Sequence, residues 1–189
     1  MRRPVLRLLV LLALGSARIA RADGDAAHQQ AQLLLRVLAY DHNLSERAGD
    51  SVTVVLVYSA RSAESRGDHA ALREGLAALD KLRVAGLPFR VTSHEYVDAD
   101  QLRALVERDR PTALYLGPGL AEQVESVSRT TRAGRVLSFA SSEAYARAGL
   151  SVAIVAGSER ARVVINLAAS RAEGAAFDAG MLKLAEVLR

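Results

Sequence analysis

Cysteine is absent from this sequence of 189 residues, and no apolar run in it is long enough to cross a membrane. Without cysteine the chain can form neither a disulfide nor a thiolate metal site, and it offers no thiol for a lipid anchor. A membrane-spanning helix needs about 20 predominantly apolar residues. The run at positions 8–14 is far shorter, and no later run approaches that length. We therefore expect no disulfide and no membrane span.

The basic character of the sequence lies in its first 22 residues. Arginines at positions 2, 3 and 7 precede the apolar run, and Ala20-Arg21-Ala22 follows it as a small-x-small cleavage site. This is the pattern of a secretory signal peptide, so we expect residues 1–22 to be removed and an exported chain to begin near Asp23. The formal net charge then falls from +4 to −1, because the segment holds five arginines and no acid. This removes the overall basic charge that would indicate a nucleic-acid partner, so we expect none.

The remaining 167 or so residues predict one domain, 23–189, because no repeat, long linker or low-complexity tract divides them. Its first segment, Ala27 to about Leu44, predicts a helix with two apolar faces. Such a helix is either buried between a sheet and a neighbouring helix, or it also meets a second protein chain. One face holds Ala31, Leu34, Leu35 and Leu38, and the other holds Leu33, Val37, Tyr40 and Leu44. Our candidate partner interface consists of Leu33, Val37 and Tyr40 of the second face.

The middle of the sequence alternates between apolar, β-branched runs and amphipathic segments. This alternation predicts βαβ units and a mainly parallel sheet with flanking helices, an α/β domain of three layers. Asp98 and Gln101 have the spacing of a capping box and predict the start of a helix that Pro111 ends. The predicted strands are Val52–Tyr58, the best candidate for a central strand, and Phe89–Val97, Thr112–Leu116 and Arg135–Ala140.

The C-terminal part of the sequence has a different pattern. Apolar residues alternate with others in Leu150–Ile154 and again in Val163–Leu167, with a turn at Gly157–Arg160 between them. This predicts an antiparallel hairpin at the edge of the sheet. A closing helix is predicted over Met181–Leu188.

No catalytic or metal-binding motif stands out. The sequence has no G-x-S-x-G elbow, and its four histidines lack the spacing that places two imidazoles on one metal ion. We expect no enzyme activity, no metal and no cofactor.

Two loops are candidates for a ligand site. Gly117 and Gly119 lie where a strand passes to a helix, a place where backbone amides can receive an anion, although a tight turn explains them equally. Ser141 and Ser142 follow the next strand, at the end of the sheet where open α/β folds bind ligands. Helix capping is the alternative explanation for these serines.

Three segments, taken in order, carry a family resemblance. They are Ala31–Asp41 with Asn43–Leu44, then Val136–Tyr145 leading to Gly149–Leu150, and Ile165–Ala169 through Gly174 and Phe177 to Met181–Ala185. The sequence in this way resembles the YfiR-like periplasmic proteins. Their C-terminal half runs from a strand ending in serines, through a short helix and a hairpin, to an I-N-L strand and a final helix.

The resemblance implies a periplasmic, non-catalytic regulator that is often a homodimer. It would bind the periplasmic domain of an inner-membrane diguanylate cyclase and hold the enzyme inactive, without binding cyclic-di-GMP itself. Several family members carry disulfide-forming cysteines, and this sequence has none. Two other classes stay open, a stand-alone module that binds a small ligand through the Gly117–Gly119 and Ser141–Ser142 loops, and a hydrolase of unfamiliar type.

Overall fold

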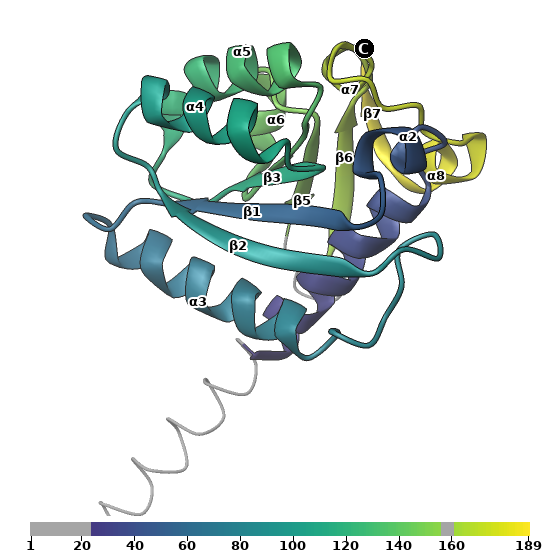
Figure 1. Cartoon of the computed structure of the whole chain (residues 1–189), viewed down its shortest axis with the longest axis horizontal. Coiled ribbons are helices and arrows are strands. Elements are labelled where there is room, and N and C mark those ends of the chain that lie inside the picture. Colours follow the sequence, from purple (N-terminus) through teal and green to yellow (C-terminus); the bar gives the residue numbers. More distant parts are fainter. Residues whose placement is uncertain (1–23, 156–160) are drawn as a thin grey trace, which may run out of the picture.

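A single seven-stranded sheet with helices on both faces organises the computed structural model (Figure 1). The structure describes residues 24–155 and 161–189. The predicted signal peptide, residues 1–22, and the predicted turn at Gly157–Arg160 lie outside the described residues. None of the helices in the described ranges is both long enough and apolar enough to cross a membrane.

The strands follow the order β2-β1-β3-β4-β5-β6-β7 across the sheet. All neighbouring strands are parallel except β5 and β6, which are antiparallel. The mainly parallel α/β architecture predicted from the sequence is confirmed. The strands are β1 Val52–Tyr58, β2 Phe89–Glu95, β3 Ala113–Leu116, β4 Leu137–Ala140, β5 Val152–Val155, β6 Arg162–Asn166 and β7 Glu186–Leu188.

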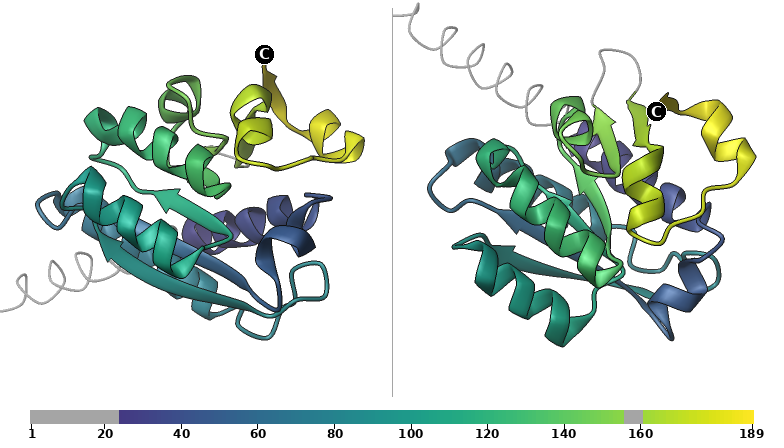
Figure 2. Two further views of the ribbon diagram at one scale, coloured as in Figure 1. Left: turned by 45° about the horizontal axis from the view of Figure 1, so that its top comes forward. Right: turned by 90° about the horizontal axis from the view of Figure 1, so that it is seen from above.

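The helices form the two outer layers, as Figures 1 and 2 show. Helices α4, α5 and α6 cover one face, and α3 together with the N-terminal helix, residues 24–39, covers the other. Each face has its own apolar core against the sheet. The remaining bounds are α2 Leu44–Ala48, α3 Ala63–Ala77, α4 Ala99–Asp109, the 3-10 helix η1 Ala121–Gln123, α5 Val124–Gly134, α6 Glu143–Arg147, α7 Leu167–Ala172 and α8 Ala179–Leu184.

Strand β1 and helix α4 show how local sequence sets these elements. Six of the seven residues of β1 are buried, because the sheet is covered on both faces and both sets of alternating side chains enter a core. The strand has the predicted bounds and pairs with β2 and β3. The Asp98 carboxylate accepts a hydrogen bond from the backbone N–H of Gln101 at 2.8 Å, so the predicted start of α4 is confirmed.

The N-terminal helix ends earlier than predicted, at residue 39 rather than near Leu44. The Asp41 carboxylate stops it by accepting hydrogen bonds from the backbone N–H groups of Asn43 and Ala176, at 3.0 and 2.8 Å. The first bond diverts the Asn43 N–H from the helical hydrogen-bond pattern, and the second joins the end of the helix to the C-terminal segment. A separate short helix, α2, begins at Leu44.

The C-terminal segment corrects two predictions. The antiparallel hairpin of β5 and β6 exists, but it does not form the edge of the sheet, because β7 pairs with β6. The closing helix is shorter than predicted. It ends at Leu184, the backbone is extended at Ala185, and the last residues pair with β6 as a strand. Leu184, expected on the inner face of that helix, is 76% exposed.

Candidate functional site

The carboxyl ends of the parallel strands lie together, as the sequence predicts for a ligand site. The backbone N–H of Gly117 donates to the carbonyl of Val57 at 3.0 Å, and that of Ser141 donates to the carbonyl of Leu116 at 3.2 Å. The loops after β1, β3 and β4 therefore meet at the carboxyl ends of these strands. This juxtaposition joins the two predicted loops.

Close packing accounts for both glycines of the turn after β3. Gly119 has a φ of +77°, and a Cβ placed there would lie 2.9 Å from Ser62 Oγ at the start of α3. A Cβ on Gly117 would lie 3.2 Å from the carbonyl oxygen of Val57. The amide of the following residue, Leu120, is taken by the hydroxyl of Tyr145 at 3.1 Å. Close packing of neighbouring elements therefore explains both glycines. This agrees with a tight turn, the alternative to an anion site.

The two serines after β4 are not explained by capping. Ser142 occupies the position before α6 in an extended conformation, yet its side chain makes no capping hydrogen bond. The Ser141 hydroxyl oxygen is buried and has no hydrogen-bond partner in the described part of the chain. A buried hydroxyl without a partner is unfavourable, so the hydrogen bonding of Ser141 is incomplete within the described part of the chain.

An open hollow of about 680 Å³ lies beside these loops. Its lining includes Ser59, Arg61 and Ser62 after β1, Tyr96 after β2, and Gly119 through Gln123. Of the four residues predicted for a ligand site, only Gly119 lines it. The serines at the start of α3 are already used, since Ser62 Oγ accepts from the N–H of Ser65 and Ser65 Oγ accepts from that of Ser59.

The three predicted interface residues of the first segment have different surroundings. Val37 is 1% exposed and belongs to the core of the domain, so it cannot contact a partner of the folded protein. Leu33 is half-buried, and Tyr40 is 36% exposed. The N-terminal helix is thus covered on two sides by its own domain, while Leu33 and Tyr40 stay available for contacts outside it.

A groove runs along the outer side of this helix. It has a volume of about 570 Å³ and lies between the helix and the segment around Leu82–Val84. Leu33 and Leu82 contribute apolar surface, and Leu82 is 49% exposed. Arg36 and Arg83 add positive charge. This combination suits a protein segment that carries both apolar and acidic side chains.

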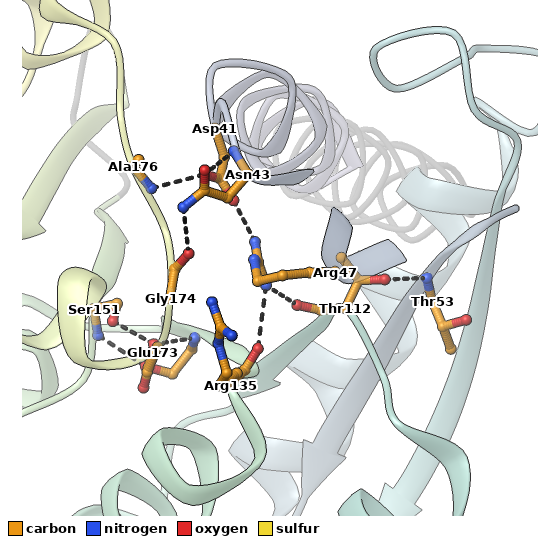
Figure 3. A network of polar contacts seen from close by, with 11 residues as sticks. Asp41, Asn43, Arg47, Thr53, Thr112, Arg135, Ser151, Glu173, Gly174 and Ala176 are labelled. Carbon is orange, nitrogen blue, oxygen red and sulfur yellow. Dashed lines mark hydrogen bonds and ion pairs between the residues drawn. The ribbon is translucent and has the colours of Figure 1, made fainter. Parts of the chain in front are cut away.

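A buried carboxylate, Glu173, lies at the other end of the strands, and sequence analysis did not identify it (Figure 3). It is fully buried, and its oxygens accept hydrogen bonds from the Thr131 hydroxyl at 2.6 Å, from the Ser138 N–H and hydroxyl, each at 2.7 Å, and from the Ser151 hydroxyl. Burial raises the pKa of the Glu173 carboxyl, and these hydrogen bonds lower it, with a net shift upward. The carboxylate joins α5, β4, β5 and the end of α7.

A buried ion pair lies next to Glu173 in the same view. Arg47 of α2 pairs with Asp41 and donates from Nη1 to the carbonyl of Thr112 at 2.9 Å. Asn43 donates to the carbonyl of Gly174 at 2.9 Å. These contacts tie the end of the N-terminal helix to β3 and to the C-terminal segment. Asp41 and Asn43 belong to a segment that carries the family resemblance, which was the only sequence signal for this network.

No cluster of three or more His, Cys, Asp or Glu side chains suited to a metal ion occurs within residues 24–155 and 161–189. His69 instead stacks on Tyr58, and its ring nitrogen lies 2.7 Å from the Ser93 hydroxyl.

The family comparison covers nearly all of the residues that form this domain. The family described as YfiR/HmsC-like matches residues 27–186, which include every described strand except the last two residues of β7. The chain belongs to this family. YfiR-like proteins are periplasmic and regulatory rather than catalytic, and membership indicates a regulator of diguanylate cyclases. Among curated proteins, none matches the sequence.

Solved structures share the fold of this YfiR-like chain at low sequence identity. A conserved domain protein from Vibrio cholerae O1 biovar El Tor has a TM-score of 0.60 and 14% identity, over 86% of this chain and 60% of its own. A Streptococcus pneumonia ABC domain in complex with L-Trp has a TM-score of 0.57 and 13% identity, over 80% and 60%. A ligand-free, open substrate-binding protein with adhesive properties from Clostridium difficile has a TM-score of 0.57 and 14% identity, over 78% and 57%. The YfiR-like chain therefore spans about three fifths of these structures, and at such identities the likeness concerns the fold alone.

Proposed function

We propose that this protein binds the periplasmic domain of an inner-membrane diguanylate cyclase and represses its synthesis of cyclic-di-GMP. The observation that carries the proposal is the family match over residues 27–186. Export through the predicted signal peptide, residues 1–22, would bring the protein to the compartment in which such a partner exposes its sensor domain.

Repression across a membrane requires a difference in affinity. A periplasmic protein can shift a cytoplasmic enzyme only through a membrane-spanning partner, and only by binding one state of that partner more tightly than the other. A hundredfold change in activity requires a preference of about 3 kcal/mol for the inactive cyclase. A modest interface with a few well-buried contacts can supply this difference.

The groove along the N-terminal helix is our proposed contact surface for the cyclase. Leu82 is 49% exposed, and Leu33 lies in the same groove, so the two leucines form adjoining apolar surface there. Arg36 and Arg83 favour a partner segment with carboxylates. Tyr40, the other exposed residue that the sequence analysis selected, is not among the groove residues described.

Deletion of the gene tests the proposal most directly. We expect higher cyclic-di-GMP and more matrix production or surface attachment, and we expect the gene on a plasmid to restore the original level. Unchanged cyclic-di-GMP, under conditions in which the protein is shown to be made, would refute repression.

Variants of the groove test the proposed surface. Leu82→Asp places a charge at the exposed apolar residue, and Arg83→Glu reverses the charge beside it, so both should weaken capture of the cyclase from membranes and raise cyclic-di-GMP. Leu184→Asp is the matched control, because Leu184 is 76% exposed and lies outside the groove. If Leu82→Asp abolishes self-association and leaves cyclase binding intact, the groove is instead a homodimer contact.

A second candidate function is supported by the buried, unpartnered Ser141 hydroxyl and the hollow beside the strand ends. In this alternative the protein is a stand-alone binding module for a small periplasmic ligand. A thermal-shift screen with small metabolites tests it. A stabilising compound whose effect disappears in Ser141→Ala would favour this candidate, whereas a screen without such a compound would remove it.

A further inference from the structure

Arginines gather in a separate hollow at the amino-terminal ends of the parallel strands. The hollow has a volume of about 480 Å³ and lies between α2 and the last turns of α4 and α5. Four of its lining residues are arginines, Arg47, Arg103, Arg110 and Arg135, against the two acids Glu46 and Glu107. An excess of guanidinium groups around one concave surface is suited to an anion.

The Arg47 side chain lines this hollow and is held in place by its neighbours. It is only 4% exposed, and its terminal nitrogens are held by Asp41 and by the Thr112 carbonyl. The Nε atom is buried and has no hydrogen-bond partner among residues 24–155 and 161–189. A buried, charged donor of this kind is unfavourable without an acceptor. An acceptor in the hollow would therefore complete the set of hydrogen bonds that Arg47 makes.

Arg110 and Arg135 have unusual backbone positions. They follow α4 and α5, with φ of 42° and 54°, in the left-handed conformation that helix ends usually give to glycine. In the described part of the chain neither guanidinium has a salt bridge to a carboxylate. Figure 3 shows the Arg135 side chain beside that of Arg47, and Arg47 Nη1 lies 3.5 Å from the Arg135 carbonyl oxygen. The positive charges of Arg47 and Arg135 are thus neighbours.

Helix dipoles explain only part of this arrangement. The carbonyl end of each helix carries about half a negative charge, so the ends of α4 and α5 together offset roughly one of the two unpaired arginines. They supply no acceptor for the Arg47 Nε atom, which has no partner in the described part of the chain. Glycine or asparagine would also occupy both left-handed positions with less strain. The choice of arginine at both positions therefore points to a ligand.

We propose that this hollow binds a phosphate group, held by Arg47 Nε and by the guanidinium groups of Arg110 and Arg135. A phosphate offers several oxygens to arginines that line the hollow from α2 and from the residues after α4 and α5, and it can carry two negative charges, whereas a carboxylate offers two oxygens and one charge. The group belongs either to a free phosphorylated compound or to the headgroup of a phospholipid. This site is independent of the proposed repression of a cyclase.

The test compares phosphate binding in the purified full-length protein and in the double variant Arg110→Asn, Arg135→Asn. Asparagine removes both guanidinium groups but tolerates the left-handed conformation, so the variant should stay folded. Arg47 is left intact because it also supports the fold. Arg129→Gln is the matched control, since Arg129 pairs with Glu125 on the exposed side of α5 and does not line the hollow.

Calorimetric titration with inorganic phosphate tests for a free phosphorylated compound. Flotation with phosphatidylglycerol vesicles, with phosphatidylcholine vesicles as the reference, tests for a phospholipid headgroup. We expect at least one of these probes to bind, with an affinity about tenfold or more lower in the double variant and unchanged in Arg129→Gln. Binding of inorganic phosphate identifies a free compound as the source, and binding of the anionic vesicles alone identifies the lipid.

The proposal is overturned if neither probe binds, or if the double variant binds as tightly as the original protein. Thermal unfolding of the same variants gives a second readout. If the arginines only offset helix dipoles, the double variant loses stability and phosphate has no effect on any of the proteins. If they form the site, phosphate raises the unfolding temperature of the original protein and of Arg129→Gln, but not that of the double variant.

Discussion

The two ends of the parallel sheet are built in opposite ways. At the carboxyl ends of β1, β3 and β4, the loops are joined by backbone hydrogen bonds and by the hydroxyl groups of Ser62, Ser65 and Tyr145. At the amino ends, buried charged side chains from distant parts of the chain meet, with Glu173 on one side and the pair of Asp41 and Arg47 on the other (Figure 3). The loops at one end are thus joined by backbone and hydroxyl groups, and the other end is joined by buried charged side chains.

Because of this difference, the amino ends should contribute more to stability, and the carboxyl ends are more available for binding. The Glu173 carboxylate and the Asp41–Arg47 pair bind segments that are far apart in sequence, so they hold the C-terminal segment to the rest of the domain. The turns at the carboxyl ends need few side chains, and there the Ser141 hydroxyl is left without a partner in the described residues. Substitutions should therefore have large effects on stability at the amino ends and smaller effects at the carboxyl ends.

The largest effect is expected for Glu173→Ala. The substitution leaves the donors of Thr131, Ser138 and Ser151 buried without an acceptor, and we expect a loss of about 4 kcal/mol in the free energy of unfolding. Chemical denaturation followed by circular dichroism measures it. Glu125→Ala, at an exposed glutamate of α5, is the control and should change little. A loss similar to that of the control would show that Glu173 does not hold the amino ends together.

Gly119→Ala should have the largest effect at the carboxyl ends. An alanine there must adopt a positive φ and place its Cβ close to Ser62 Oγ, so we expect a loss of about 2 kcal/mol. Gly67 is the matched control, because it lies within α3 and a Cβ there meets no atom within 4 Å. Gly67→Ala should stabilise the protein by about 0.5–1 kcal/mol. If both substitutions stabilise, the turn is not constrained by α3.

Glu173 should also make stability depend on pH. Its pKa in the folded state is raised by burial, so the folded protein binds this proton more tightly than the unfolded chain does. Its contribution is complete below the ordinary carboxyl pKa of about 4 and is lost as pH rises through the raised value. The unfolding free energy of the original protein minus that of Glu173→Gln should therefore decrease as pH rises from 4. A difference that stays constant or increases with pH would contradict the upward shift.

The smallest effect is expected for Ser142→Ala. The Ser142 side chain makes no capping hydrogen bond, so its removal should change the free energy of unfolding by less than about 0.5 kcal/mol. Asp98→Ala is the contrast, because Asp98 caps α4 through the N–H of Gln101 and should cost about 1 kcal/mol. Thermal unfolding of the two variants compares them. Equal losses would mean that Ser142 does cap α6 in solution.

The sequence alone predicted the elements whose pattern is local. Strand β1 has the predicted bounds because every residue of a run such as Val52–Tyr58 can be buried in a sheet covered on both faces. The start of α4 was predictable because Asp98 and Gln101 are three residues apart and bond to each other. The three resembling segments likewise indicated the family that the comparison shows.

Only the tertiary structure decided which apolar residues are exposed and which charged residues are buried. Val37 and Leu33 share one helical face in the sequence, but only Val37 enters the core, because burial depends on neighbouring elements and not on helical period. The last residues form β7 rather than a longer helix because β6 offers its open edge to them. Glu173, Asp41 and Arg47 are ordinary charged residues in the sequence, and only contacts between segments as distant as Asp41 and Ala176 make them a buried network. Such contacts leave no local pattern, since each partner's position is set by the fold of the whole chain.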